Sequence, residues 1–146
     1  MSSKEKIIRQ REGKALNVIG DHITIKLTGK DTNGLFTLVE QNNPPGTVVP
    51  PHIHTREDEV FQVIEGMVEF HFEEQIHVLQ SGDSIFLPRN HMHFFKVLGE
   101  QPAKVSLSIF PAGIEDMFEE LATLPEGPPD IEKVKGICSR YGVSIL

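Results

Sequence analysis

The chain has 146 residues and a mass of 16.4 kDa, which fits one domain and leaves little room for two cores. Its 14 Lys and Arg residues are outnumbered by 21 Asp and Glu residues, so the formal net charge is −7. This balance repels a phosphate backbone and excludes nucleic acid as a favoured partner. The hydrophobic fraction of 38%, with nine Phe, supports a packed core.

The sequence also predicts a compartment. We find no apolar run near the roughly 18 residues that a membrane helix requires, and residues 1–14 lack the apolar stretch of a signal peptide. The single cysteine, Cys138, has no partner for an internal disulfide and is interpreted as a small core residue. We therefore expect a cytoplasmic protein with no membrane partner.

The negative charge is concentrated in one segment. Residues 105–132 contain seven acidic residues and no Lys or Arg, whereas the rest of the chain has 14 acids and 14 bases. Charge runs of this kind are usually the solvated face of a helix. We therefore assign the acidity to a C-terminal tail and not to a binding site.

From residue 21 to residue 110, apolar and polar residues alternate with a period of two, which predicts short strands. The first is expected at 23–27 and is followed by a loop at 29–34. Further strands are expected at 35–41, 59–65, 67–73, 76–79, 83–87, 93–98 and 104–110. Short strands without crossover helices predict a sandwich or barrel.

Beyond Pro111 the apolar residues recur at helical spacing. Two stripes are separated by a proline-rich break at 125–129: Ile114, Met117, Phe118 and Leu121, then Ile131, Val134, Ile137, Cys138 and Tyr141. Gly142 ends the second stripe. We predict an all-β fold with two short C-terminal α-helices packed on it.

Two pairs of histidines have a spacing of two residues: His52 with His54, and His91 with His93. On a strand this spacing places both side chains on one face, so that an extended segment can present two imidazoles to one metal ion. The spacing by itself is common, and its surroundings decide what it means.

The residues around the first pair form a longer pattern. Gly46 is followed after five residues by His52 and, two positions on, by His54. Four residues then precede Glu59, and six more precede Gly66. This spacing is rare by chance, and it resembles the first motif of the cupin superfamily at each of these positions.

A second segment resembles the second cupin motif. Gly82 is followed after five residues by Pro88 and then by His93. Asn90 stands where the family often has Gly, and Val97 replaces the trailing Asn. Because Asn tolerates positive φ, a turn at 88–90 remains feasible. The chain is thus identified as a small single-domain cupin (a monocupin) similar to the quercetin 2,3-dioxygenase-like cupins.

The resemblance implies a double-stranded β-helix, the jelly-roll barrel of the cupins. Within one structural domain we expect N-terminal strands at 1–34 that complete the barrel, a cupin core at 35–110 and a C-terminal helical extension at 111–146. Small cupins commonly dimerise through sheet edges, so we also expect a homodimer that uses the N-terminal strands.

The resemblance also implies a ligand set, which is His52, His54, Glu59 and His93. Three imidazoles and one carboxylate suit one divalent transition metal ion, which is Fe, Mn, Ni, Cu, Co or Zn, and disfavour calcium or magnesium. As a ligand that can detach, Glu59 is also the candidate catalytic base.

Alternatives to two of these ligands lie nearby. Glu57 or Asp58 could supply the carboxylate, although the strand alternation places Glu59 on the apolar face. His91 has the same parity as His93 and could replace it, but the spacing within the second motif favours His93.

The predicted substrate pocket is mainly apolar and aromatic, and its residues are Phe61, Val63, Arg89, His91 and Phe95. Arg89 is the base best placed to meet an anionic substituent, and His91 is placed at the mouth. Such a lining suits a small, flat organic molecule as the partner.

The activity that the resemblance implies is that of a metal-dependent dioxygenase acting on a small aromatic or enol or diketone-type substrate. The alternative is a non-catalytic cupin module that binds a metal ion or a small molecule. An isomerase or epimerase is disfavoured because few bases lie near the site. Since cupin barrels carry many functions, the choice depends on the site.

Overall fold

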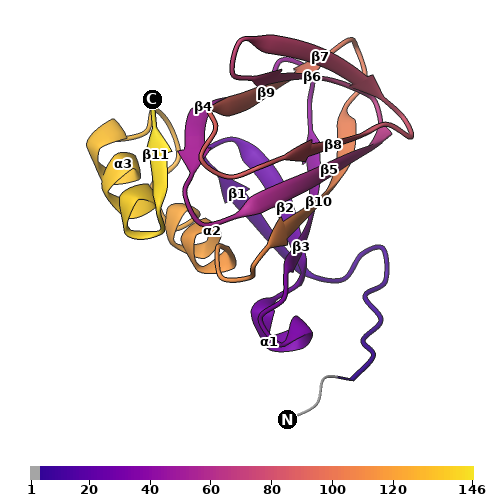
Figure 1. Cartoon of the computed structure of the whole chain (residues 1–146), viewed down its shortest axis with the longest axis vertical. Helices are drawn as coiled ribbons and strands as arrows, with labels where there is room; N and C mark the ends of the chain where they lie inside the picture. Colours follow the sequence, from indigo (N-terminus) through magenta and orange to yellow (C-terminus); the bar gives the residue numbers. More distant parts are fainter. Residues whose placement is uncertain (1–3) are drawn as a thin grey trace.

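The computed structural model describes residues 4–146, in which two antiparallel sheets face each other around one core (Figure 1). The first sheet contains β1 (Lys14–Val18), β2 (Asp21–Leu27), β3 (Thr37–Asn43), β10 (Ala103–Phe110), β5 (Asp58–Glu65) and β8 (Ser84–Leu87), in that order. The second contains β11 (Val143–Ile145), β4 (Val48–His54), β9 (His93–Leu98), β6 (Met67–Phe72) and β7 (Gln75–Gln80). This is the predicted all-β jelly-roll barrel.

The strands form because every second side chain enters the core. In β10, which pairs with both β3 and β5, Ala103, Val105, Leu107 and Ile109 are all buried, whereas the residues between them are more exposed. The turn between β5 and β6 requires Gly66, whose φ is 86°. A Cβ at this position would lie 2.7 Å from the carbonyl oxygen of Pro102.

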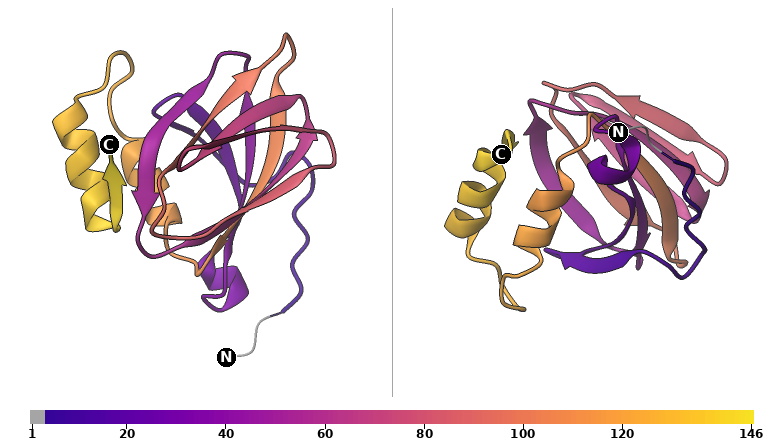
Figure 2. Two further views of the ribbon diagram at one scale, coloured as in Figure 1. Left: turned by 45° about the horizontal axis from the view of Figure 1, so that its top comes forward. Right: turned by 90° about the horizontal axis from the view of Figure 1, so that it is seen from below.

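The helices α2 (Glu115–Leu121) and α3 (Ile131–Arg140) lie side by side against one side of the barrel, as the second view in Figure 2 shows. The apolar stripes predicted from sequence are largely buried, although Ile131 at the start of α3 is 52% exposed. Cys138 is 2% exposed, and burial raises the pKa of its thiol, which suits a small core residue. In the part of the chain described, none of the helices is long and apolar enough to cross a membrane.

Four elements were not among the ranges expected from the sequence, and one of them is β4, the strand that carries His52 and His54. The predicted loop at 29–34 contains a one-turn helix, α1 (Gly29–Thr32), whose N-terminus is capped because the Asp31 carboxylate accepts the Thr28 N–H at 2.9 Å. The strand β1 pairs with β2, and β11 pairs with β4. Both of these strands are short, and their pairing partners hold them in place.

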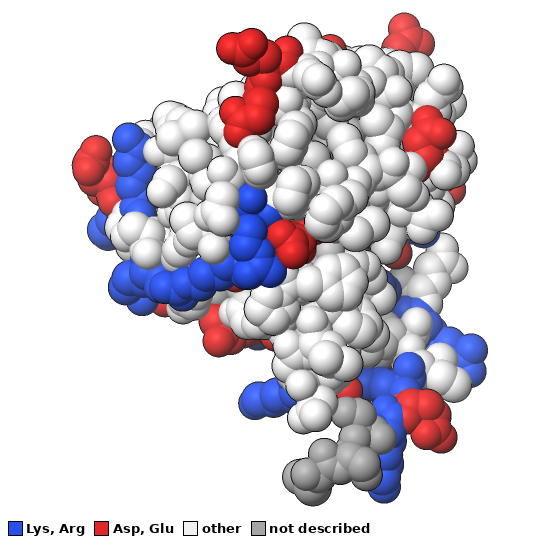
Figure 3. All heavy atoms as spheres, in the orientation of Figure 1, with Lys and Arg blue, Asp and Glu red and all other residues white. Residues whose placement is uncertain are grey.

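The acidic C-terminal segment is not a uniformly solvated acidic face. Glu115 is buried, Glu119 pairs with Lys14, and Glu120 pairs with Arg140. On the face drawn in Figure 3, acidic and basic side chains both lie at the helical side, and much of the upper barrel wall is uncharged. Bases from the rest of the chain therefore offset part of the local charge.

Candidate metal centre

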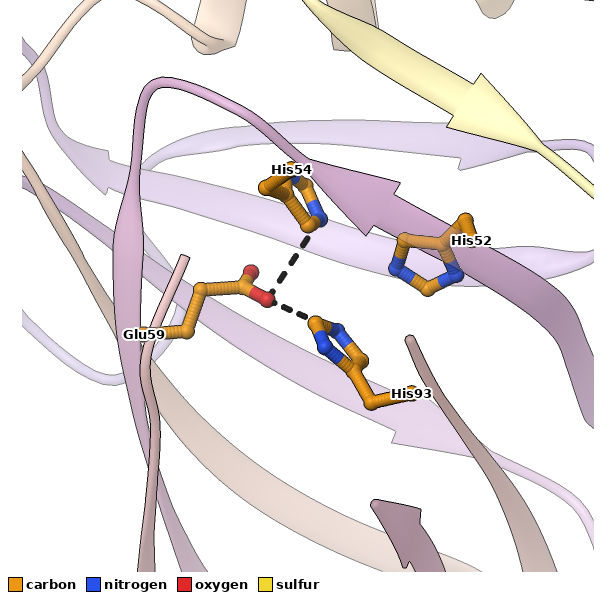
Figure 4. A group of neighbouring side chains, drawn as sticks. All are labelled: His52, His54, Glu59 and His93. Carbon is orange, nitrogen blue, oxygen red and sulfur yellow. Dashed lines mark ion pairs between the residues drawn. The ribbon is translucent and has the colours of Figure 1, made fainter. Parts of the chain in front are cut away.

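Four side chains from both sheets meet inside the barrel (Figure 4). His52 and His54 lie at the end of β4, and His93 begins β9 directly opposite His52 in the strand register. Glu59 comes from β5 in the other sheet. The i, i+2 spacing aims both β4 imidazoles inward, and the facing sheet supplies the carboxylate.

The cluster is tight and buried. One potential ligand atom from each of the four residues lies within 4.8 Å of the others. The Oε1 atom of Glu59 is 3.1 Å from Nε2 of His93 and 3.4 Å from Nε2 of His54. All four residues are between 2% and 8% exposed. The structure thus brings together the four residues that the cupin resemblance implied.

Electrostatics favour a neutral His52 and an ionised Glu59 in this cluster. Burial, and then the neighbouring His54 and His93, lower the pKa of His52 to about 3. Burial by itself would raise the pKa of Glu59, but the adjacent imidazoles of His54 and His93 outweigh it and lower the pKa to about 2. These are the protonation states that metal ligands require.

The imidazole of His52 is already oriented for ligation. Its Nδ1 lies 2.7 Å from the carbonyl oxygen of Pro50, an arrangement in which Nδ1–H donates to that oxygen. The lone pair is then on Nε2. This backbone contact fixes the tautomer in the way that metal-binding histidines commonly require.

The unpartnered atoms of the cluster fit a metal ion. Among residues 4–146, Oε1 of Glu59 and both ring nitrogens of His93 are buried without a hydrogen-bond partner. Leaving such atoms unpaired costs about 1–3 kcal/mol each. A divalent transition ion would satisfy Oε1 of Glu59 and one ring nitrogen of His93, because nitrogen and carboxylate donors are its usual ligands.

Glu57 is an additional carboxylate at the site, which sequence reasoning treated only as a rival to Glu59. It is 5% exposed, and its Oε1 lies 3.4 Å from Nδ1 of His54. Burial lowers the pKa of His54, but the charges of Glu59 and Glu57 outweigh it and raise that pKa. Glu57 therefore lies behind His54, the place that outer carboxylates commonly take beside metal-binding histidines.

A cavity of about 200 Å³ adjoins the cluster. His52, His54 and Glu59 line it together with Phe61 and Phe95, two of the predicted pocket residues. The C-terminal elements supply much of its remaining apolar wall: Met117, Phe118, Leu121, Ile131, Val134, Cys138, Val143 and Ile145. The helices thus help to enclose the site, a role that their acidic composition did not indicate.

Val63 was expected in the pocket but lies outside the cavity lining. It is fully buried, and it comes four residues after Glu59 in β5. Among the buried residues of β5, Glu59 and Phe61 line the cavity, whereas Val63 pairs with Val105 of β10. It belongs to the core and not to the pocket wall.

Arg89 and His91 also lie outside the cavity lining, because acidic residues on the outer surface pair with them. The Arg89 guanidinium donates to both carboxylate oxygens of Asp58, each at 3.1 Å. His91 lies 3.2 Å from Glu73, and its side chain is 46% exposed. The sequence order placed both near the second motif but could not show which way they point.

The turn that precedes β9 has the predicted form. Asn90 has a φ of 69°, so Asn replaces the family's Gly without loss of the turn. The Asn90 N–H donates to the carbonyl oxygen of His54 at 2.8 Å. This bond ties the second motif to the end of β4 and helps to position His93 opposite the first pair.

Comparison with known families identifies the class of protein. The cupin-domain family matches residues 39–110, a span that contains all four clustered residues. Together with the two-sheet barrel and the buried His and Glu cluster, this match shows that the chain belongs to the cupin superfamily.

The individual relatives share about a third of their aligned residues with this chain. The chain is 33% identical to "Germin-like protein subfamily 2 member 2" of Arabidopsis thaliana over 138 residues, covering 88% of this chain and 61% of the relative. It is 33% identical to "Quercetin 2,3-dioxygenase" of Aspergillus japonicus over 104 residues, covering 66% of this chain and 29% of the relative. The chain therefore spans less than two thirds of the length of these curated relatives.

A solved structure supports the fold assignment. KdgF from Halomonas sp. superposes with a TM-score of 0.66 and 24% sequence identity, covering 77% of this chain and 99% of that protein. At this level of identity the likeness concerns the barrel alone.

Proposed function

We propose that this cupin is a metal-dependent dioxygenase that acts on a small aromatic or enol or diketone-type compound. The observation that carries the proposal is a cluster of three imidazoles and one carboxylate, three members of which, His52, His54 and Glu59, line an otherwise mainly apolar cavity. The sequence similarity to quercetin 2,3-dioxygenase supports the same class of chemistry. The substrate and dioxygen are the two reactants, and both oxygen atoms enter the product.

The volume of the cavity limits the size of the substrate that it can hold. A cavity of about 200 Å³ is somewhat larger than the roughly 150 Å³ cavity that accepts benzene in an engineered protein. It is smaller than the roughly 300–1,000 Å³ sites of drug-sized ligands. The proposed substrate is therefore a single ring or a short diketone, such as a catechol.

Each protein group has a role in this proposal. His52, His54, Glu59 and His93 would hold one transition ion of the Fe, Mn, Ni, Cu, Co or Zn group, and Glu57 would keep His54 in its orientation. When bound, the ion would supply Lewis-acid and redox chemistry at this end of the cavity.

Glu59 and the apolar wall act on the substrate. As a ligand that can detach from the ion, Glu59 would accept the proton of an enol or catechol hydroxyl on its carboxylate, which leaves the substrate oxygen negatively charged. Phe61 and Phe95 would pack against the organic ring and exclude water from it. The substrate would thus be oriented with its oxygen atoms towards the histidines.

Elemental analysis of the purified protein, followed by oxygen-electrode assays, tests the proposal. We expect about one transition ion per chain and oxygen uptake with catechols, enols or diketones. The His52→Ala variant should lose both. The matched control is His91→Ala, which removes an exposed histidine outside the cavity and should retain both.

One result would overturn the dioxygenase assignment. If the metal-loaded protein binds these compounds but consumes no oxygen with any of the six ions, the protein is a non-catalytic binding module. Product analysis with isotopically labelled dioxygen provides a second check, since a dioxygenase incorporates both atoms.

A further inference from the structure

A second polar group lines the same cavity, away from the four clustered residues. Asp21 begins β2, and Gln41 lies near the end of β3. Both line the cavity that His52, His54 and Glu59 also line. Apart from these two groups and the residues around the metal centre, the lining is mainly apolar, so any ligand that fills the cavity meets polar chemistry at two places.

Hydrogen bonds hold this second group rigidly. The Asp21 carboxylate accepts the Asn43 amide at Oδ1 over 2.8 Å and the Gln41 amide at Oδ2 over 2.9 Å. The Asn43 side chain is oriented in turn, because its Oδ1 accepts the backbone N–H of His22 at 2.8 Å. The network therefore sets the orientation of both amides.

The network leaves acceptor capacity unused. Gln41 is 3% exposed, and its Oε1 has no hydrogen-bond partner in the described chain. The amide nitrogen of Gln41 donates to Asp21, so a flip of the side-chain amide that swaps its oxygen and nitrogen would break that hydrogen bond. Each Asp21 oxygen also has a second lone pair. The missing partner is a hydrogen-bond donor.

The register places this group at a distance from the proposed metal centre but within its electrostatic reach. On β10, Ile109 pairs with Glu59, whereas Val105, four residues earlier, pairs with Gln41. Burial raises the pKa of Asp21 above its ordinary value despite its two amide donors, and the charge of Glu59 adds to the rise.

We propose that Asp21 and Gln41 form a specificity subsite that binds a hydroxyl group on the organic ligand, at a position remote from the oxygen atoms that face the histidines. The ligand class is then a small ring or chain with oxygen donors at one end and a neutral hydroxyl donor at the other. This inference rests on the proposed function, because it uses the same cavity and the same ligand.

Binding to the zinc-loaded protein tests the subsite without turnover, since zinc has no redox chemistry. The probes are methylcatechol and hydroxymethylcatechol, each substituted at ring position four, so that they differ by one hydroxyl. We expect calorimetry to give about 3- to 10-fold tighter binding of hydroxymethylcatechol to the wild type, as one hydrogen bond would supply. The side-chain amide signal of Gln41 in ¹⁵N NMR spectra should shift with this probe only.

Two variants remove the subsite. In Gln41→Met the amide is absent, and in Asp21→Asn the acceptor that holds it is weakened. In both, the affinity ratio of the two probes should fall to about 1, with zinc still bound. Glu40→Gln is the matched control, because Glu40 lies on the outer face of β3 near Lys104. It should keep the wild-type ratio.

The outcomes separate this proposal from the proposed function. Equal affinity for the two probes in the wild type, no binding of either, or an unchanged ratio in both folded variants overturns the subsite, whether or not oxygen is consumed. A preference that the variants abolish supports the subsite, even if no metal-loaded form consumes oxygen. If Gln41→Met does not fold, the subsite is tested by the probe affinity ratio of Asp21→Asn and by the NMR shift of the Gln41 side-chain amide in the wild type.

Discussion

Two buried glutamates in this barrel have opposite surroundings. Glu115, at the start of α2, accepts hydrogen bonds from the Thr37 hydroxyl at 2.6 Å and from the backbone N–H groups of Gly113 and Gly29 at 2.7 and 2.8 Å. Glu59 is buried as deeply, but its Oε1 has no hydrogen-bond partner within residues 4–146. It faces the imidazoles of His54 and His93 instead.

The difference separates a structural carboxylate from a functional one. Glu115 joins α1, β3 and α2, and its hydrogen bonds satisfy both of its oxygen atoms. Glu59 is held in a cluster whose polar atoms lack partners, which costs free energy unless a ligand binds. Burial of an acidic side chain therefore does not by itself indicate a ligand-binding site, whereas burial without a hydrogen-bond partner does.

The largest effect should follow the loss of a clustered histidine. His93→Ala should abolish the stabilisation that a bound transition ion gives, which is about 4 kcal/mol at a metal concentration 1,000 times Kd. Thermal unfolding with and without metal measures it. His91→Ala removes the exposed histidine two positions away and should retain the full shift. An equal metal-induced shift in His93→Ala would remove this residue from the ligand set.

Glu115→Ala should reduce the free energy of unfolding of the metal-free protein by about 2–3 kcal/mol, because it leaves the donors of Thr37 and two backbone groups unpaired. Urea unfolding measures this loss. The neighbouring exposed Asp116 is the control, and Asp116→Ala should cost less than about 1 kcal/mol. Metal affinity should not change in either variant, and a clear loss of it would break the distinction between the two glutamates.

Glu57→Gln should weaken metal binding by about 10- to 100-fold, since the carboxylate that orients His54 becomes neutral. A competition titration with a chelator measures the affinity. Asp58→Asn changes the adjacent acid, which pairs with Arg89 on the outside, and should leave the affinity unchanged. Equal affinities in wild type and Glu57→Gln would make Glu57 a merely buried residue.

A smaller effect should appear in the pH dependence of stability. Burial opposes ionisation of Glu115, but its hydrogen bonds outweigh this and lower its pKa below the unfolded value. Its ionised form therefore stabilises the fold above the unfolded pKa, and this contribution is lost as the pH falls through the folded pKa. Wild type should exceed Glu115→Gln by about 1 kcal/mol near pH 6, and the gap should close as the pH falls through the lowered pKa of Glu115. A gap independent of pH would contradict this.

Part of the site could be predicted from the sequence because its geometry is local. Two histidines two residues apart on a strand share a face whatever the rest of the fold does, and the motif spacing pointed to Glu59 and His93. The orientation of Arg89 and His91 could not be predicted, because Asp58 and Glu73 pair with them on the outside. Those pairings depend on how β5 and β6 lie beside the second motif.

The alternation of side chains along β2 and β3 could have indicated the Asp21 and Gln41 group from the sequence. Asp21 has the parity of the buried Ile23 and Ile25, and Gln41 has that of Val39. Polar residues on an apolar face are candidates for a buried network. Their meeting in one cavity, however, depends on the pairing of β2 with β3.

The sequence by itself determined the alternation of the strands and the two helical stripes, because these depend on periods of two or 3.6 residues along the chain. The spacing of its motifs also indicated the four clustered residues. The tertiary structure alone decided which buried acid is satisfied, which polar residues share the cavity and how the C-terminal helices enclose it. These features arise where segments distant in sequence pack together, and no local period encodes such contacts.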